Sequence, residues 1–316
     1  MHLKAHRYFA MVALTGSFIA TARHFQVPAS SVSRFIAALE QELGQQLLYR
    51  NTRGVKLTEA GERYYSQVRE VIELLDAADE SLLGQAEHIH GLVRINAPQA
   101  LGSLQIAGLL DRLHDVYPDI TVELTLTDAF IDPVQEGADI TLRVGHMEDS
   151  GLIGRKVAEQ RYVLAASAAY VERYGRPASP EQLTEHACLV YKGRAGAQRW
   201  HFSQPGEARP QVVEVKGPLR SNNAQVLAAA ARSGRGIVLF PTWLYAKDDF
   251  TSGAMIDLLP DWQGAVDADP SPIHLLSPEN RLRSRKVQAV SSFLLEAIGT
   301  PPYWDDLGIE LPPALR

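Results

Sequence analysis

The sequence is poor in the features that mark secreted and membrane proteins. Its 316 residues contain a single cysteine, Cys188, which cannot form a disulfide within the chain and fits a reducing compartment. No stretch approaches the ~18 uninterrupted apolar residues of a membrane-spanning helix, and residues 1–4 lead into an amphipathic pattern rather than a signal region. These absences predict a cytoplasmic protein, and 46% hydrophobic content supports two or three domains with sizeable cores.

The sequence also lacks the motifs of the common enzyme classes. It contains no Gly-x-Ser-x-Gly turn, no phosphate-binding loop and no Gly-x-Gly-x-x-Gly after a strand, and its ten histidines are scattered without metal-ligand spacing. Cys188 lies in the apolar run 187–190, which favours a buried structural thiol over a nucleophile. The glycine-rich segment 232–236 follows an expected helix and fits a C-cap. We expect no catalytic residues, no metal and no cofactor; an enzyme without these motifs stays open as an alternative.

The charges that are present are distributed unevenly. Residues 1–57 contain seven lysines and arginines against Glu40 and Glu42, a local net charge of +5, so the rest of the chain carries −11 of the total of −6. A basic module on an acidic body is typical of nucleic-acid binders, because phosphates respond to the local patch. The charges alone would also fit a protein whose surface charge is unevenly distributed but does not bind nucleic acid.

The basic module contains the pattern of a helix-turn-helix. A short helix is expected over Phe18–Phe25, and the segment Gln26–Pro28 ends it, because proline cannot continue a helix. A second helix begins near Pro28 or Ala29, where proline costs no hydrogen bond. Apolar residues expected to face inward recur at helical spacing in both helices: Ile19, Ala22 and Phe25 in the first, and Val32, Phe35, Ile36, Leu39 and Leu43 in the second.

The outward face of the second helix is suited to reading DNA. It presents Ser30, Ser31, Ser33 and Arg34 near the end that enters the major groove in helix-turn-helix proteins. The segment Arg50–Lys56 follows as a glycine-containing basic loop, which indicates a wing beside the duplex. Without the wing and the helix that follows it, the two helices would fit equally a helical hairpin with a solvated basic loop that does not bind DNA.

Two further helices flank this motif. Residues 3–14 form a first helix that places Leu3, Phe9, Val12 and Leu14 behind it. After Thr58, a plausible N-cap, a helix runs to about Gln85. Its apolar residues fall at steps of four and three, which predicts a dimer-forming seam or, alternatively, packing on the chain's own core; they are Tyr64, Val68, Val71, Leu75, Ala78 and Leu82.

Beyond a polar stretch that ends near Gly91, strands and helices alternate. The order over residues 91–145 predicts a parallel α/β unit, and a second α/β unit follows from residue 162. The proline-rich segment 300–316 shows no clear preference for helix or strand. Expected strands are 91–98, 120–127, 138–145, 162–166, 188–191, 200–202, 211–219, 236–240 and 273–276, and expected helices are 102–116, 168–174, 223–233 and 284–298.

The N-terminal segment resembles the DNA-binding domain of LysR-type transcriptional regulators. One departure is that the family's serine-proline before the second helix is here Pro28-Ala29, which leaves its first residue open by one position. The residues that carry the resemblance keep the family's order without a gap: Gly16–Phe18, Ala20–Ala22, Val32–Arg34, Leu39-Glu40, Glu42–Gly44, Leu47-Leu48, Arg50, Arg53 and Leu57–Gly61.

The body resembles the family's effector-binding domain, in which two α/β subdomains of periplasmic-binding-protein type are crossed by two strands. The match rests on Gly91–Ile95, Tyr117-Pro118, Asp139–Arg143, Ala169-Tyr170, Gly175–Pro177, Leu219–Asn223, Gly234–Ile237 and Val287–Leu294. The resemblance implies a winged helix-turn-helix domain (1–58), a linker dimerisation helix (59–90), an effector-binding domain (91–300) and a C-terminal tail (301–316). Within the effector-binding domain, the first subdomain comprises 91–162 and 271–300, and the second comprises 163–270.

In such a body a ligand binds beyond the carboxyl ends of the strands, where helix N-termini favour an anion. Candidate effector-binding residues at these ends are Gln99, Ala100, Phe130, His146, Ser221, Asn222 and Phe240. The alternative for each of these residues is that it only caps a helix or fills a turn and does not contact a ligand.

The prediction is therefore a LysR-type regulator that binds double-stranded DNA as a homodimer through the linker helix and as a homotetramer by family resemblance. Its DNA-binding residues are Ser30, Ser31, Ser33, Arg34, Arg50, Arg53 and Lys56, and its effector is a small, anionic molecule. A ligand-binding module that has lost its DNA function, or a DNA-binding protein that needs no ligand, are the alternatives of the same fold.

Overall fold

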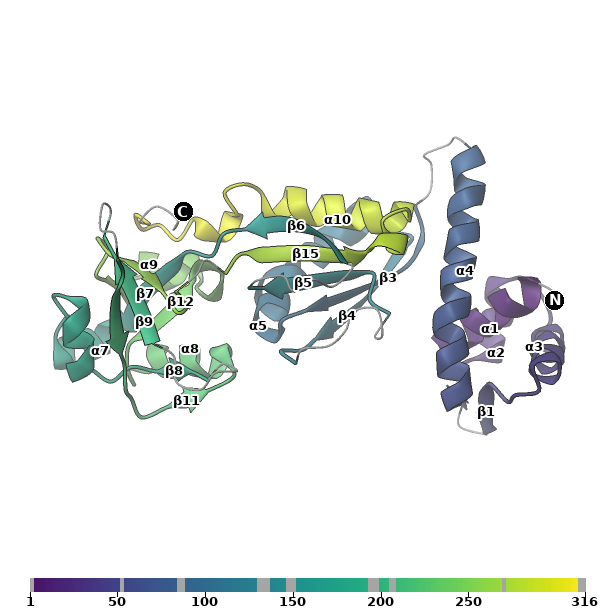
Figure 1. Cartoon of the computed structure of the whole chain (residues 1–316), viewed down its shortest axis with the longest axis horizontal. Helices are drawn as coiled ribbons and strands as arrows, with labels where there is room; N and C mark the ends of the chain where they lie inside the picture. Colours follow the sequence, from purple (N-terminus) through teal and green to yellow (C-terminus); the bar gives the residue numbers. More distant parts are fainter. Residues whose placement is uncertain are drawn as a thin grey trace. The chain divides into compact units, whose positions relative to one another are not determined.

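The computed structural model describes residues 3–51, 54–83, 89–129, 137–145, 152–192, 199–204, 209–268 and 271–311 (Figure 1). The chain divides into two units. One takes in Met1–Glu87 and Arg283–Arg285, and the other takes in His88–Leu282 and Lys286–Arg316.

The N-terminal unit has the predicted helices and wing. Its helices are α1 (Leu3–Thr15), α2 (Phe18–His24), α3 (Ala29–Leu43) and α4 (Glu59–Leu83). The wing is an antiparallel hairpin of β1 (Leu48–Asn51) and β2 (Gly54–Leu57), which pairs Leu48 with Leu57. Helix α2 begins because the Ser17 hydroxyl accepts a hydrogen bond from the amide of Ala20, and α3 ends at Gly44, whose φ of 63° is the left-handed conformation that glycine adopts readily.

The core of this unit lies where α1, α2 and α3 meet. Phe9, Val12, Val32 and Ile36 are fully buried, and the ring of Tyr8 packs on those of Phe25 and Phe35. The inward face predicted for α3 is thereby confirmed.

Three apolar residues that were expected to pack inward are exposed. Ile19 is 61% exposed, because the buried face of α2 passes through Thr21 and Ala22 and Ile19 lies off that face. Leu3 and Leu14 are 42% and 40% exposed. Each lies two residues away from a buried position of α1, which turns it to the far side of the helix.

Helix α4 is anchored to the wing at its first turn. The Thr58 hydroxyl accepts a hydrogen bond from the amide of Gly61 at 2.9 Å and donates one to the carbonyl of Gln46 at 2.7 Å, so the predicted N-cap is confirmed. Gly61 is required here, because a Cβ at this position would lie 2.0 Å from the carbonyl oxygen of Leu47.

The expected seam of α4 divides into two parts. Tyr64 and Val68 pack on α1 of the same chain, where the Tyr64 hydroxyl lies 2.9 Å from Nε2 of His6. Farther along, Val71 is 61% exposed and Ala78 is exposed, whereas Leu75 is half-buried; Leu74, which lies beside the expected seam, is 48% exposed. The first part of the seam therefore serves the chain's own core, and the second part is exposed at Val71 and Ala78; the side chain of Leu82 lies outside the described residues.

The second unit contains a five-stranded sheet in the order β4-β3-β5-β15-β6 (Figure 1). Strand β3 (Gly91–Ala97) is parallel to β4 (Ile120–Leu126) and β5 (Ile140–Val144), as predicted. The predicted strand 273–276 is present as β15 (Ile273–Pro278), which pairs antiparallel with β5 and with β6 (Leu152–Ala158), a strand that the sequence pattern did not indicate.

Helices cover this sheet. The predicted helix 102–116 starts earlier and has three parts: α5 (Gln99–Leu101), the π-helical turn η1 (Gly102–Ile106) and α6 (Ala107–Val116). Helix α10 (Arg285–Ile298) buries Val287, Val290 and Leu294.

A second sheet is antiparallel along its main path and has the order β10-β9-β14-β7-β12, with β13 also paired to β7. Helix α8 (Ala224–Arg232) is capped by the side chain of Asn223, whose oxygen accepts a hydrogen bond from the amide of Val226.

The sequence pattern missed three elements of this part of the chain, namely α9 (Lys247–Thr251), β13 (Met255–Leu258) and β14 (Gln263–Ala265). The remaining elements are β7 (Tyr162–Ser167), α7 (Ala168–Tyr174), η2 (Pro180–Glu185), β8 (Val190–Tyr191), β9 (Arg199–Ser203), β10 (Gln211–Glu214), β11 (Arg220–Ser221), β12 (Val238–Pro241), η3 (Thr242–Leu244) and η4 (Glu279–Arg281).

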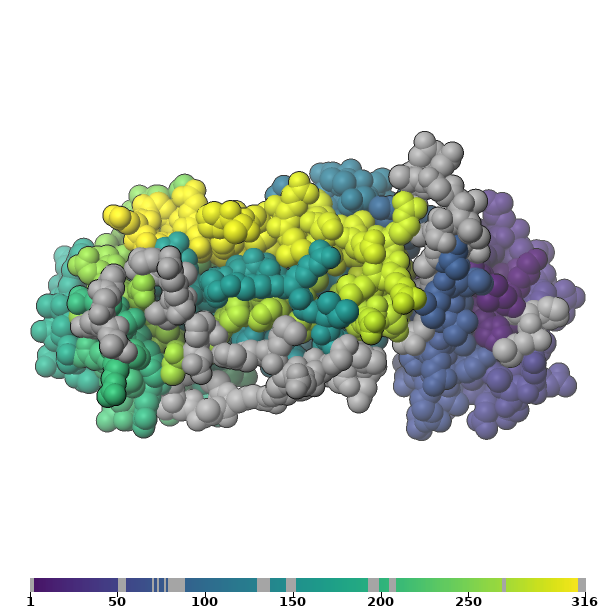
Figure 2. Space-filling view, turned by 45° about the horizontal axis from the view of Figure 1, so that its top comes forward, coloured from purple at the N-terminus to yellow at the C-terminus, as the bar shows by residue number. Residues whose placement is uncertain are grey.

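The chain passes between the two sheets after β6, at residues 159–161, and between β14 and β15. It crosses again after α10, where the C-terminal segment with η5 (Tyr303–Asp305) buries Trp304 and Leu307 beside η3. The yellow atoms of α10 and this segment form a band on the surface of the second unit (Figure 2). The predicted fold class is confirmed: a winged helix-turn-helix with a long linker helix, followed by two α/β subdomains.

Candidate functional site

The first candidate site is the front of α3. Ser30, Arg34 and Ala37 are exposed, whereas Ser31 and Ser33 are half-buried. Helix α3 starts at Ala29 with Pro28 as N-cap, which settles the position left open by the sequence. Arg34 has no hydrogen bond or ion pair with the described residues, so its guanidinium is available to a ligand.

The wing is held to α3 by one carboxylate. Glu40 Oε1 accepts hydrogen bonds from the amides of Leu47 and Leu48 at 2.9 and 3.0 Å, and Oε2 pairs with Arg50 Nη2 at 2.7 Å. Arg50 also donates to the Ser33 hydroxyl at 3.4 Å, and its guanidinium lies 5.3 Å from the ring centre of Phe18. Arg50 thus fixes the wing against α3 through contacts within the protein.

The hairpin register divides the wing into two faces. Tyr49 pairs with Lys56 and Arg50 pairs with Val55, so Tyr49 and Lys56 share the face opposite Arg50. Tyr49 is 58% exposed and Lys56 is also exposed. The sequence reasoning missed Tyr49, although its place in the basic loop was visible; Arg53 lies outside the described residues.

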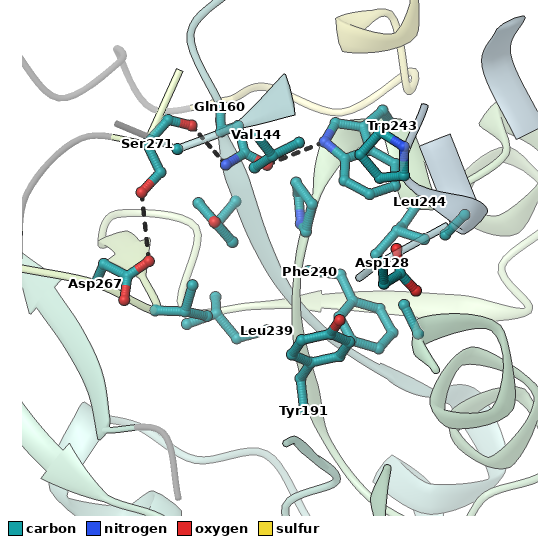
Figure 3. A pocket seen from close by; sticks show the side chains of 17 residues that line it. Asp128, Val144, Gln160, Tyr191, Leu239, Phe240, Trp243, Leu244, Asp267 and Ser271 are labelled. Carbon is teal, nitrogen blue, oxygen red and sulfur yellow. Dashed lines mark hydrogen bonds between the residues drawn. The ribbon is translucent and has the colours of Figure 1, made fainter. Parts of the chain in front are cut away.

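The second candidate site is a pocket of about 250 Å3 between the two subdomains (Figure 3). It lies at the carboxyl ends of β3, β4 and β5, where such folds bind ligands. The residues that line it are Pro98, Ala100, Asp128, Val144, Gly145, Gln160, Tyr162, Tyr191, Ala224, Leu239, Phe240, Pro241, Trp243, Leu244, Val266, Asp267 and Ser271.

The structure brings some of the predicted effector-binding residues to this pocket. Ala100 and Phe240 line it, whereas Gln99, Ser221 and Asn222 are not among the lining residues. The Ser221 hydroxyl accepts a hydrogen bond from the amide of Asn223 at 3.0 Å, a turn-forming contact. The remaining two predicted residues, Phe130 and His146, lie outside the described residues.

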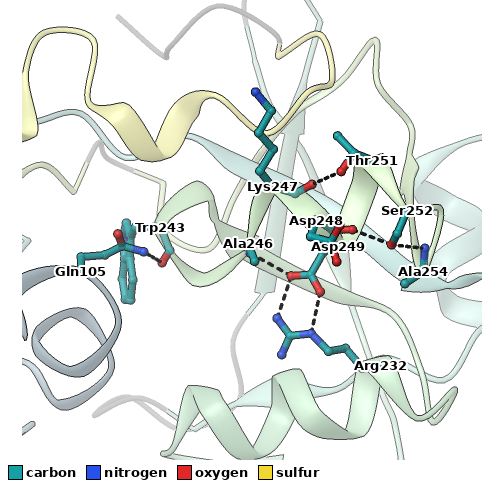
Figure 4. Close-up of polar contacts among 10 residues, drawn as sticks. All are labelled: Gln105, Arg232, Trp243, Ala246, Lys247, Asp248, Asp249, Thr251, Ser252 and Ala254. Carbon is teal, nitrogen blue, oxygen red and sulfur yellow. Dashed lines mark hydrogen bonds and ion pairs between the residues drawn. The ribbon is translucent and has the colours of Figure 1, made fainter. Parts of the chain in front are cut away.

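Several lining residues escaped the sequence reasoning because they lie on the crossing segments. Gln160 donates from Nε2 to the carbonyl of Ser271 at 2.6 Å and accepts from Trp243 Nε1 at 3.1 Å, which joins both crossings to η3 (Figure 3). The carbonyl of Trp243 accepts a third contact, from Gln105 Nε2 at 2.7 Å (Figure 4). Trp243, a residue of the second subdomain, is thereby held by two glutamines of the first, with its ring at the pocket.

A second network fixes the elements behind η3. Arg232 at the end of α8 donates from Nε and Nη2 to the two oxygens of Asp249 at 2.8 and 2.7 Å (Figure 4). Asp249 also accepts from the amide of Ala246 at 2.9 Å and so caps α9. Such a bidentate pair adds geometric order as well as energy.

Two carboxylates face the pocket, each beside a tyrosine. Burial raises the pKa of the Tyr191 hydroxyl, and the negative charge of Asp128 raises it further. Burial likewise raises the pKa of Tyr162, and Asp267 adds to that effect. In Figure 3, Asp267 and Ser271 lie at one side of the pocket and Asp128 and Leu244 at the other.

Cys188 is buried, as predicted, and its thiol is not suited to act as a nucleophile. Its Sγ donates to the carbonyl of Leu183 at 3.6 Å, and burial raises the pKa of its thiol to about 12. At neutral pH the thiolate that reacts with electrophiles is therefore almost absent. Among the described residues, no group of histidine, cysteine and carboxylate side chains could hold a metal, and no helix could span a membrane.

Comparisons with known proteins identify both units. Residues 3–62 match the bacterial regulatory helix-turn-helix protein, lysR family, and residues 86–299 match the LysR substrate binding domain. The uncharacterized HTH-type transcriptional regulator YhjC of Escherichia coli K12 is 32% identical over 292 residues, 92% of this chain and 96% of that protein. The HTH-type transcriptional activator AaeR of the same strain is 30% identical over 294 residues, with 93% of each chain covered.

Solved structures of full-length regulators agree. CrgA of Neisseria meningitidis, a LysR-type transcriptional regulator, matches with a TM-score of 0.60 and 26% identity over 95% of this chain and 99% of that one. AphB, a virulence activator of Vibrio cholerae, matches with a TM-score of 0.57 and 28% identity over 94% of this chain and 99% of that one. The expectation that the protein is not an enzyme is confirmed, because these relatives are regulators. The chain belongs to the LysR family of bacterial DNA-binding transcriptional regulators.

Proposed function

We propose that this regulator binds a specific operator through α3 and the wing, and that a small molecule in the pocket between the subdomains modulates this binding. The observation that supports the proposal most directly is Arg34 at the front of α3, which is exposed and has no hydrogen bond or ion pair with any described residue, next to a wing held by Glu40. The protein acts in the bacterial cytoplasm, where its DNA is. Its functional parts are the DNA-binding domain (1–58), the linker dimerisation helix (59–90), the effector-binding domain (91–300) and the C-terminal tail (301–316).

In this proposal the front of α3 enters the major groove. Ser30, Ser31 and Ser33 contact phosphates or base edges, and Arg34 pairs with a guanine or clamps a phosphate. Arg53 reaches the minor groove or its phosphates. Lys56 contributes a phosphate contact, and Arg50 acts chiefly by fixing the wing through its ion pair with Glu40.

The protein binds its operator as a dimer that pairs α4, and further as a dimer of dimers. The exposed seam residues Val71 and Ala78, with the exposed Leu74 beside them, support this arrangement, because a long helix with an exposed apolar stripe gains stability from a partner. Two copies of α3 would then meet the two halves of a symmetric operator.

The effector binds beside the start of α5. The predicted anionic effector depends on free amides at helix N-termini. Here the carboxylate of Asp128 already accepts the amide hydrogen bond of Gln99, at 3.0 Å. An anion bound at this position would lie beside the negative charge of Asp128.

Fluorescence anisotropy of the intact protein on DNA from its own upstream region, across a salt series, tests the operator proposal. Tight, salt-steep binding that survives non-specific competitor is expected. Arg34→Ala should weaken it by about ten- to a hundredfold. Gln41→Ala, an exposed change at the far end of α3, serves as the control and should bind like the natural protein. Equal affinity of the two variants would contradict the role of Arg34.

The two alternatives of the same fold predict different results. A ligand-binding module without DNA function would bind the upstream DNA no more tightly than random DNA. A regulator without a ligand would bind its operator, but its melting temperature would not respond to any small molecule.

A further inference from the structure

We propose that the pocket between the subdomains takes a small organic cation, an amine on a flat apolar body, as its effector. The inference rests on the proposed role of this pocket and defines the chemical class of its ligand.

Every charged side chain on the described lining is a carboxylate. These are Asp128, which follows β4, and Asp267, on the crossing between β14 and β15; the described lining contains no lysine or arginine. Both carboxylates are exposed, so solvent and salt screen part of their charge. Two negative charges around one cavity still disfavour a ligand carboxylate and favour a positive charge.

Each carboxylate keeps one oxygen for a ligand. Oδ1 of Asp128 accepts from the amide of Gln99 at 3.0 Å, and Oδ2 of Asp267 accepts from the Ser271 hydroxyl at 3.3 Å. The second oxygen of each has no hydrogen-bond donor among the described residues. The engaged oxygens orient the carboxylates, and the remaining oxygens are acceptors suited to an ammonium group.

Aromatic rings complete the lining. Tyr162, Tyr191, Phe240 and Trp243 contribute to its wall, and Phe240 and Tyr191 overlap near the middle of the view in Figure 3. The indole N–H of Trp243 is taken by Gln160, so the ring meets a ligand through its carbon surface. Ring faces attract cations through their quadrupole and pack against flat apolar bodies.

The start of α5 points to the same class. A helix N-terminus attracts anions through its free amides, but the Asp128 carboxylate already occupies this one. The chain thus supplies its own anion where a ligand carboxylate would otherwise bind, and Ala100, with no hydroxyl, lines the wall beside it.

Three probes with one body and different charges test the proposal on the full-length protein: 2-phenylethylamine, 2-phenylethanol and 3-phenylpropionate. Calorimetric titration is expected to show the amine binding most tightly, with an affinity that falls as salt rises. Asp128→Asn and Asp267→Asn should each weaken amine binding about three- to tenfold, because asparagine keeps the acceptor oxygen but removes the charge. Asp261→Asn, a change of an exposed carboxylate outside the lining, should leave amine binding unchanged.

Three results would overturn the proposal: tighter binding of phenylpropionate than of the amine, equal binding of all three probes, or no binding of the amine at millimolar concentration. Operator anisotropy, measured in parallel without any probe, reports separately on the proposed function. Intact operator binding together with a preference for the carboxylate would reject the cation and retain the regulator. Loss of operator specificity would reject the proposed function whichever probe binds.

Discussion

Single glycine and carboxylate positions show how closely this chain is packed. At Gly61 the first turn of α4 meets the carbonyl of Leu47, the residue that precedes the wing. The same carbonyl accepts the amide hydrogen bond of Thr58 at 2.9 Å. The glycine of the Leu57–Gly61 motif is thus explained by a backbone contact that no side chain can enter.

Gly61→Ala should therefore destabilise the N-terminal unit, by about 1–3 kcal/mol, because the new methyl group forces the wing away from α4. Gly108→Ala is the matched control. A Cβ at Gly108, inside α6, would meet nothing within 4 Å, and alanine there should be neutral or stabilise by up to about 1 kcal/mol. Urea denaturation of both variants measures the two effects; equal stabilities would contradict the packing argument.

A half-buried carboxylate on β13, Asp257, makes the second unit sensitive to pH. Burial raises the pKa of Asp257 to about 7, and the amide of Leu258 and the charge of Arg176 offset only part of this effect. Because the folded protein holds a proton that the unfolded chain releases near its ordinary pKa of 3.8, stability is greatest below that value and declines as pH rises through about 7.

Asp257→Asn should remove this decline. At about pH 8 the variant should be more stable than the natural protein by on the order of 2 kcal/mol, a figure reduced for partial solvent screening, and the difference should shrink toward pH 5. Thermal melts across this range measure it. Asp261→Asn, at an exposed carboxylate, should show no such pH-dependent gain; a constant difference at every pH would speak against titration of Asp257.

At the scale of elements, the C-terminal segment acts as part of the body. Asp305 accepts from the Thr242 hydroxyl at 2.6 Å, and Arg161 on the first crossing donates to the carbonyl of Leu311 at 2.9 Å. Trp304 is 4% exposed and packs with the core beside Leu244. The segment lies beyond residue 299, where the match to the family's effector domain ends.

Trp304→Ala should destabilise the second unit by about 3–5 kcal/mol, the usual cost of removing a large buried ring. Tyr303→Phe is the control, since Tyr303 is 44% exposed and loses only the hydroxyl contact with Gln105. Its effect should stay below about 1.5 kcal/mol. Similar melting temperatures for the two variants would show that the segment contributes little.

At the scale of the whole molecule, the uncovered stripe on α4 connects structure to assembly. Val71→Glu should shift the protein toward the monomer, because a charge would be buried in the proposed pairing of two helices. Val212→Glu, on β10 and 50% exposed, is the matched control and should keep the natural mass. Light scattering coupled to size-exclusion chromatography measures the molar mass of both variants in solution. An unchanged mass for Val71→Glu would show that the dimer contact lies elsewhere.

The sequence by itself determined the local elements of the N-terminal unit. Spacing of three and four set the inward face of α3, Pro28 limited its start to Pro28 or Ala29, and Thr58 capped α4; each depends on neighbours within a few residues. The same reasoning misplaced Ile19, because which stripe of a short helix is buried depends on its partners. The parallel arrangement of β3, β4 and β5 was also predicted, from the alternation of strands and helices.

Only the tertiary structure decided the pocket and the crossings. Gln160, Trp243 and Ser271 are far apart in the chain, and their contacts arise where three segments meet between the sheets. Strand β6 escaped prediction because most of its residues are exposed and lack alternation, and it is held by pairing with β15. Ligand class depends on which charges converge, and convergence is a property of the fold rather than of any local pattern.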